Sequence, residues 1–283
     1  MLNSLQRINQ KVCFICGASY SGSTLLGLIL GSHQDCFYSG EPNKTRFLED
    51  TDYSITKRSC KYCGVNCPVW KDFIVSDSLD LYEQLSIKTK KPIVIDSTKV
   101  ITWVEEQIAT LQKTSSRLYL IFLQRDGRAV INSRIRKCPE EDIKEAINGW
   151  KERIIQTQEL YRNFKGNKIK IKYENLATDT ESVTRTLCNF LEIDYQPQML
   201  QYYQHEHHPL GGNSGTQSLV AKAQNKNIEE FLLKIPERYR DYYQNHGLEI
   251  NLDMRWRQEI DPKVERLFEE MAGKENEEFK WNM

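Results

Sequence analysis

The sequence lacks an excess of charge of either sign. Its 283 residues include 39 basic and 39 acidic side chains, which gives a formal net charge of zero and a pI near 7.0. A neutral chain generates no field that would attract a polyanion. We therefore expect neither a nucleic acid nor a membrane surface as a partner, and local clusters of basic residues carry more information than the total charge.

Long apolar runs are also missing. The longest, around residues 25–30, is far shorter than the about 20 residues that a membrane-spanning helix needs. The first ten residues, MLNSLQRINQ, are polar and do not resemble the apolar region of a signal peptide. These absences predict a cytoplasmic protein, in which most of the eight cysteines would be reduced.

Short apolar runs alternate with segments of helical periodicity. The sequence predicts strands at residues 11–18, 92–97, 116–126 and 167–176. It predicts helices at 23–32 and 182–191, one that follows the second strand and ends at about residue 111, and one that begins near residue 127 after the third strand. This alternation is typical of the α/β class, with a P-loop-like parallel sheet flanked by helices on both faces. We expect a single domain over residues 1–283, with an irregular cysteine-containing insertion around 43–80 and a flexible loop around 213–227.

Polar side chains follow each expected strand. Residues 21–24 and Lys99 come shortly after an expected strand, and Arg125 and Tyr173 lie in the last part of one. In parallel sheets, ligands bind beyond the carboxyl ends of the strands. The sequence therefore predicts a ligand site at this edge of the sheet.

The first of these segments, GASYSGSTLL, has the outline of a phosphate-binding loop. Gly17 and Gly22 have the spacing of the motif GxxxxGK[ST], but Ser23 stands where that motif has its lysine. Backbone N–H groups and the dipole of the following helix would suit an anion there. The alternative is a Gly/Ser turn without a ligand. A nucleophile elbow of the GxSxG type is excluded because no serine has glycines at that spacing.

A second anion site is indicated by LQRDGRAVINSRIRK. Arg125 stands at a strand end, and Ser133 follows about two helical turns later. A guanidinium binds phosphate through two parallel hydrogen bonds, and a serine could complete such a site. For Arg134, Arg136 and Lys137, an ordinary basic helix face is the alternative. Two separate sites imply a ligand with two anionic groups.

The motifs GASYSGSTLL, DSTK, RDGRAVINSRIRK, KYENL and HHPLGGN occur in this order over about residues 11–256. In this the chain resembles sulfotransferases that use 3′-phosphoadenosine 5′-phosphosulfate (PAPS) and release adenosine 3′,5′-bisphosphate (PAP). It is most similar to bacterial members with a YSGSTLL loop, a following Gly-Glu pair and a small cysteine cluster.

The resemblance implies a role for each matching residue. The loop that holds the 5′-phosphosulfate corresponds to Tyr20, Ser21, Gly22, Ser23, Thr24 and Leu25. Arg125 and Ser133 correspond to the pair that binds the 3′-phosphate, and Tyr173 to an aromatic side chain beside the adenine. The segment that closes over the cofactor corresponds to His208, Gly212 and Asn213.

Two further residues are candidates for the chemistry of sulfuryl transfer. Glu41, in the Gly-Glu pair, is the candidate base, with a surface glutamate as the alternative and Asp96 as a weaker candidate. Many family members carry a cation in the loop where this chain has Tyr20, and we expect Lys99 to replace it unless it is a solvated helix-start lysine.

An arginine that relatives often show after the Gly-Asn pair is missing. Lys222 or Lys226 could take its place, or the 3′-phosphate site could be weaker.

Cysteines cluster in CKYCGVNC. Cys60, Cys63 and Cys67 could bind zinc with a remote fourth ligand or form a disulfide. Residues 205–208, HEHH, lack the spacing of a helical metal-ligand pair, and we expect a loop near the cofactor there. No metal is assigned on this pattern alone.

The sequence thus predicts transfer of a sulfuryl group from PAPS to a hydroxyl or amine of a small-molecule acceptor. The acceptor would belong to secondary metabolism, with saxitoxin-type alkaloids as one candidate. A P-loop kinase or NTPase is an alternative, opposed by Ser23 and by the lack of an obvious Walker-B aspartate. A nucleotide-binding module without catalysis is another, suggested by Tyr20.

Overall fold

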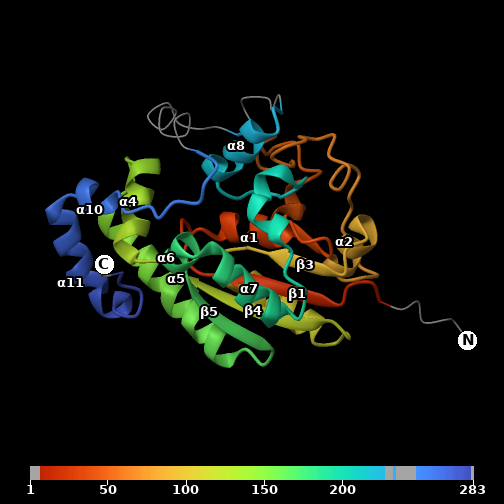
Figure 1. Cartoon of the computed structure of the whole chain (residues 1–283), viewed down its shortest axis with the longest axis horizontal. Coiled ribbons are helices and arrows are strands. Elements are labelled where there is room, and N and C mark those ends of the chain that lie inside the picture. Colours follow the sequence, from red (N-terminus) through yellow and green to blue (C-terminus); the bar gives the residue numbers. More distant parts are fainter. Residues whose placement is uncertain (1–6, 227–231, 234–246, 282–283) are drawn as a thin grey trace, which may run out of the picture. The chain divides into compact units, whose positions relative to one another are not determined.

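The computed structural model describes residues 7–226, 232–233 and 247–281. Five strands form one sheet in the order β2-β3-β1-β4-β5 (Figure 1). Their bounds are β1 Lys11–Cys16, β2 Cys36–Gly40, β3 Ile93–Asp96, β4 Arg117–Gln124 and β5 Asn167–Lys172. The parallel sheet is flanked by helices, which confirms the predicted fold class.

The helices connect these strands in the described part of the chain. Their bounds are α1 Ser23–Gly31, α2 Leu81–Thr89, α3 Ile101–Leu111, α4 Gly127–Lys137, α5 Ile143–Asn163, α6 Tyr173–Thr178, α7 Thr180–Leu191, α8 Ser214–Ala223, α10 Trp256–Glu259 and α11 Pro262–Asn276. Two 3-10 helices, η1 at Pro42–Phe47 and η2 at Pro197–Gln204, complete the list. Residues 48–80 contain turns, bends and isolated bridges, whereas η1 occupies Pro42–Phe47. The irregular insertion expected at 43–80 stays a prediction.

The strands β1 and β3 are buried along their whole length. They run parallel, with Val12 opposite Val94 and Phe14 opposite Asp96. A strand covered on both faces reads as a continuous apolar run, and this is why residues 11–16 and 93–96 could be predicted as strands.

Strand β2 was not predicted from the sequence. Its sequence, CFYSG, is brief and ends in Ser39 and Gly40, which disfavour strands. Tertiary contacts compensate: β2 pairs in parallel with β3, and the Ser39 hydroxyl donates to the Ile95 carbonyl oxygen (2.9 Å). The expected strand at 167–176 also ends early, because Tyr173 begins α6.

The prediction of a flexible loop at 213–227 was wrong for residues 214–223, which form α8. Asn213 caps this helix by accepting a hydrogen bond from the Thr216 N–H (3.0 Å). Leu219 and Val220 are buried against the rest of the molecule. Tertiary burial of one helix face therefore overrides the polar composition of the segment; residue 227 lies outside the described residues.

The chain divides into two compact units. The first comprises the described residues up to Ile15, Thr24–Leu120, and those of Gln196–Leu248; the second comprises Cys16–Ser23, Ile121–Tyr195, and those of Glu249–Met283. Each unit is therefore assembled from three separate segments. The single sulfotransferase domain stays a prediction.

The core of the second unit lies among α4, α5 and α11, which pack side by side (Figure 1). The Trp150 ring lies 5.2 Å from the Phe268 ring and 6.0 Å from the Phe279 ring, centroid to centroid. A Cβ on Gly127, the first residue of α4, would come within 2.4 Å of Phe268 and 2.7 Å of Trp150. Glycine at this position lets the start of α4 reach the aromatic core.

Candidate functional site

The loop between β1 and α1 has the backbone of an anion-binding turn. Gly17 (φ 140°), Tyr20 (φ 65°) and Gly22 (φ 92°) all have positive φ. A Cβ on Gly17 would lie 2.4 Å from the Leu123 carbonyl oxygen, so only glycine fits there. Helix α1 begins at Ser23, directly after the turn.

Ser21 lies in this loop with its hydroxyl buried. The residue is 1% exposed, and its Oγ has no hydrogen-bond partner among the described residues. Buried hydroxyl groups are normally paired, because an unpaired one costs about 1–3 kcal/mol. A hydroxyl in this state suits a loop that donates to a bound anion.

Arg125 joins this loop to the residues that follow β4 and β5. Its Nη1 donates to the Tyr20 carbonyl oxygen (2.7 Å), and its guanidinium lies over the Tyr173 ring at 4.3 Å. The side chain is 8% exposed, and its Nε has no hydrogen-bond partner in the described part of the chain. The structure thus brings Tyr20, Ser21, Arg125 and Tyr173 together within the second unit.

Asp253 also contacts Arg125, which the sequence did not predict. Its Oδ2 lies 3.4 Å from Arg125 Nη2, and the Arg255 guanidinium bonds the same carboxylate at 2.7 and 2.8 Å. Burial alone would raise the pKa of Asp253, but the Arg255 hydrogen bond and the charge of Arg125 lower it below its usual range. A phosphate at Arg125 would therefore compete with an ionised carboxylate.

Tyr173 packs directly on the loop. A Cβ on Gly22 would lie 2.5 Å from the Tyr173 ring, so the second glycine of the motif is needed for this contact. The ring is buried, which raises the pKa of its hydroxyl, and the hydroxyl lies 3.4 Å from the Asn251 carbonyl oxygen. Because Arg125 covers one ring face, only the rest of the ring is left to contact an adenine.

Two other predicted loop and helix residues have structural partners. Burial raises the pKa of Tyr20 to about 12, so its hydroxyl stays protonated and the side chain is neutral. A phenol carries no positive charge in either protonation state, and Tyr20 therefore supplies no cation. The Ser133 hydroxyl donates to the Ala129 carbonyl oxygen within α4 (2.9 Å). Its pairing with Arg125 stays a prediction.

The first unit carries the second half of the loop motif. The Asn213 backbone N–H donates to Thr24 Oγ1 (2.9 Å), and a Cβ on Gly212 (φ 88°) would lie 3.1 Å from that oxygen. The predicted closing segment therefore lies beside the start of α1. Leu25, the next residue of the motif, is half-buried on α1.

Glu41 follows β2 and lies next to a cation. Its Oε2 pairs with Lys44 Nζ at 2.7 Å, and both side chains are about a quarter exposed, at 24% and 27%. The Glu41 backbone N–H donates to the Leu210 carbonyl oxygen (2.7 Å), which ties it to the Gly212 segment. Lys44 was not singled out from the sequence, because it lies in the segment that was expected to be irregular. In the structure it is part of η1.

Lys99 lies at the end of β3 but points toward β1. Its ammonium donates to the Ile15 carbonyl oxygen (3.1 Å). Burial raises the pKa of the neighbouring Asp96 to about 6, although the Thr98 backbone N–H and the Tyr82 hydroxyl both stabilise its charged form. Asp96 is 1% exposed and held at both oxygens, which favours a structural role over that of a base.

No protein-family model matches this chain. Over 206 residues, 69% of this chain and 70% of the relative, it is 25% identical to a Caenorhabditis briggsae protein named "Putative protein-tyrosine sulfotransferase". Over about two thirds of its length, the chain is therefore similar to a sulfotransferase.

Solved sulfotransferase structures share the fold. The sulfotransferase domain of the Synechococcus PCC 7002 olefin synthase matches with a TM-score of 0.63 and 17% identity, covering 97% of this chain and 96% of that domain. A mouse sulfotransferase complexed with PAP matches with a TM-score of 0.50 and 12% identity, covering 95% and 86%. In the described residues, none of the helices is both long and apolar enough to cross a membrane.

The sulfotransferase-like chain also carries a cluster of sulfur and nitrogen atoms in its first unit. The ligand atoms of Cys60, Cys63, Cys67 and His208 all lie within 4.8 Å of one another. None of the eight cysteines forms a disulfide in the structure, including the three for which one was considered from the sequence. His208 was expected at the cofactor, and that role stays a prediction; its ring contacts the thiols instead.

The two lysines considered as substitutes for the missing arginine lie at the end of α8 and just after it. Lys222 is in the last turn of the helix, and Lys226 Nζ lies over the Tyr62 ring, 5.5 Å from its centroid. Tyr62 belongs to the cysteine-containing segment. Lys226 therefore contacts that segment, and the role of either lysine at a phosphate stays a prediction.

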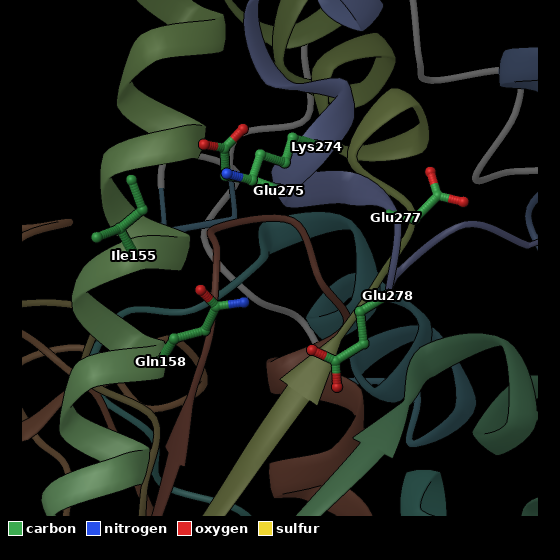
Figure 2. Close-up of a pocket in the computed structure, with 6 residues that line it drawn as sticks. All are labelled: Ile155, Gln158, Lys274, Glu275, Glu277 and Glu278. Atoms are coloured by element: carbon green, nitrogen blue, oxygen red, sulfur yellow. The ribbon is translucent and has the colours of Figure 1, made fainter.

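A pocket of about 590 Å³ lies elsewhere in the second unit (Figure 2). It is lined by Ile155, Gln158, Lys274, Glu275, Glu277 and Glu278. None of these is a predicted site residue, and three carboxylates would repel a phosphorylated ligand. The loop after β1 remains the better candidate site.

Proposed function

We propose that the chain transfers a sulfuryl group from PAPS to a hydroxyl or amine of a small-molecule acceptor. The observation that carries the proposal is the buried Ser21 hydroxyl, which has no hydrogen-bond partner among the described residues and lies in a glycine turn at the start of α1. The turn lacks the lysine that a nucleotide triphosphate would need, and an anion without bound metal fits it better. Relationship to sulfotransferases supports the same donor.

The residues of the second unit fit such a donor. Ser21, Ser23 and the backbone of Gly22 would hold the 5′-phosphosulfate by donating hydrogen bonds to its oxygens. Arg125, whose Nε has no hydrogen-bond partner in the part of the chain that the structure describes, would bind the 3′-phosphate together with Ser133. Tyr173 would lie beside the adenine. When bound, PAPS supplies the sulfuryl group and leaves as PAP.

The candidate chemical groups lie in the first unit. Glu41 would take the acceptor proton, and its ion pair with Lys44 fixes the orientation of the carboxylate. Lys99, a cation at a strand end, would replace the positive charge that Tyr20 cannot supply. Thr24, Leu25, Gly212 and Asn213 would complete the loop that encloses the donor.

We propose that the acceptor is a polar small molecule of secondary metabolism, with saxitoxin-type alkaloids as one candidate. The name of the C. briggsae relative adds tyrosine-containing peptides to the acceptors to be screened. The protein is proposed to act in the cytoplasm.

Calorimetric titration with PAP tests the donor without requiring the acceptor. We expect tight binding that does not need magnesium, that Arg125→Ala abolishes, and that Arg185→Ala leaves unchanged. Arg185 is a matched control because it stacks on Tyr195 and pairs with Glu181 on the exposed face of α7. Binding of Mg-ATP without binding of PAP would overturn the proposal in favour of a P-loop kinase or NTPase.

Catalysis needs a second measurement. With PAP binding established, a screen with PAPS should yield sulfated product, and Glu41→Gln and Lys99→Ala should each lower its rate. If the parent forms no product with any acceptor class and both variants match it, the chain is a binding module instead.

A further inference from the structure

Four potential metal ligands converge in the irregular part of the first unit. Cys60, Cys63 and Cys67 lie between η1 and α2, and His208 follows η2. His208 Nδ1 lies 3.3 Å from Cys63 Sγ and 3.5 Å from Cys67 Sγ. In tetrahedral zinc sites, Zn–S bonds of about 2.3 Å and Zn–N bonds of about 2.0 Å place S and N ligands about 3.5 Å apart. The two separations between His208 Nδ1 and the sulfur atoms therefore agree with a tetrahedral site.

The backbone around the cysteines supports thiolates. The Tyr62 N–H points at Cys60 Sγ (3.4 Å), and backbone N–H groups of Val69 and Trp70 donate to Cys67. Gly64, directly after Cys63, has φ 63°, and its N–H closes the turn onto the Cys60 carbonyl oxygen (3.0 Å). Hydrogen bonds to sulfur orient metal-bound cysteines and offset their negative charge. The turn thus presents both cysteines of the CxxC pair to one point.

His208 is oriented as a ligand by groups other than the cysteines. Its Nε2 lies 3.2 Å from the Glu206 carboxylate, on the side of the ring away from the thiols. Its carbonyl oxygen accepts a hydrogen bond from Trp70 Nε1 (2.6 Å). A histidine that binds metal through one nitrogen usually donates its other N–H to a carboxylate or carbonyl. This arrangement leaves Nδ1 free to coordinate among the sulfur atoms.

A disulfide explains the cluster less well. A disulfide would use two of the three cysteines. The third cysteine and His208 would then have no role in a site where Cys60 and Cys67 are fully buried. Three thiolates and one imidazole make a complete ligand set for zinc. Sites with four protein ligands are structural, whereas catalytic sites keep a position open.

We propose that Cys60, Cys63, Cys67 and His208 bind one Zn²⁺ as a closed structural site. The metal would link the segment after η1 to the chain at residue 208. Leu210, two residues further, forms bridges to both Gly40 and Cys60, and its carbonyl oxygen accepts a hydrogen bond from the Glu41 N–H. Asn213, three residues after Leu210, donates its backbone N–H to Thr24. Zinc would therefore fix the segment that contacts both of these candidate site residues.

Metal analysis of the full chain tests this proposal directly. The protein is produced in zinc-supplemented medium, purified with reductant and without chelator, and its zinc is measured by mass spectrometry. We expect about one zinc per chain in the parent, and at least a tenfold loss in Cys63→Ser and His208→Ala. Cys138→Ser and His205→Ala are matched controls that should keep their zinc, because both residues lie outside the cluster.

Cobalt replacement keeps the test decisive if the variants fold poorly. Parent protein stripped of metal and loaded with Co²⁺ should show thiolate charge-transfer bands and the intense d–d bands of tetrahedral cobalt. A parent without zinc and without these bands would overturn the proposal. So would a disulfide among the three cysteines in the freshly purified protein, or zinc retained in both cluster variants.

Discussion

Replacing Ser21 with alanine should weaken ligand binding without weakening the fold. The Ser21 hydroxyl is buried and has no partner in the described chain, so it contributes no internal hydrogen bond that the substitution could remove. Because a buried unpaired hydroxyl costs about 1–3 kcal/mol, Ser21→Ala should leave the free energy of unfolding unchanged or raise it by about 1 kcal/mol. Most substitutions of buried residues have the opposite sign.

The effect on binding should be a loss. If the hydroxyl donates to the phosphosulfate or to the 5′-phosphate of PAP, that charge-assisted hydrogen bond contributes about 1.5–3 kcal/mol. Its removal should raise the dissociation constant for PAP by about 10- to 150-fold. Ligand binding and fold stability would then move in different directions.

Urea denaturation and calorimetric titration with PAP measure the two quantities. Ser32→Ala is the matched control: Ser32 directly follows α1 and is 5% exposed, and its hydroxyl donates to the Leu28 carbonyl oxygen (2.8 Å). The control should lose about 0.5–1.5 kcal/mol of stability and bind PAP like the parent. If Ser21→Ala is destabilised as much as the control and binds PAP unchanged, Ser21 is an ordinary buried serine and our account of the loop is wrong.

Three further predictions follow from contacts around the site and the core. Asp253→Asn should tighten PAP binding several-fold in calorimetry, because the carboxylate no longer competes for Arg125; weaker binding would mean that Asp253 positions the guanidinium. Asp96 has a folded pKa of about 6 against about 3.9 when unfolded, so the folded state binds more protons between these values and stability falls as pH rises through them. The pKa difference should lower the free energy of unfolding by about 3 kcal/mol between pH 3 and pH 7. Urea denaturation across that range should show this loss in the parent but not in Asp96→Asn; equal pH profiles of the two proteins would contradict the assignment to Asp96. Gly127→Ala should lower the free energy of unfolding by about 1–3 kcal/mol, because its methyl group would overlap Phe268; an unchanged denaturation midpoint would show that the core can adjust.

Local sequence patterns predicted those parts of the fold and site that depend on neighbours in the chain. The buried strands β1, β3 and β4 and the positions of Ser21 and Arg125 follow from apolar runs and from the polar residues just after them. The prediction that Arg125 and the loop belong to one ligand site at the edge of the sheet needed only the rule that ligands bind beyond the carboxyl ends of parallel strands. The contact of the Arg125 guanidinium with Tyr20 agrees with it.

What the sequence did not reveal depends on contacts between distant residues. Asp253 is 128 residues from Arg125 and lies in no regular element, so no periodicity marks it. His208 is separated from Cys63 by 145 residues, and its own neighbours suggested a cofactor loop. The helix α8 was missed because its apolar positions are few, and only their burial identifies the helix face.

The interleaving of the two units has a practical consequence for anyone who wants to divide this chain into fragments. The eight residues Cys16–Ser23 belong to the second unit, although the residues before and after them belong to the first. A single cut at any unit boundary removes a segment that one of the units requires. Neither unit can be expressed as one uninterrupted stretch of the natural sequence, so isolating either would require a circularly permuted or spliced gene.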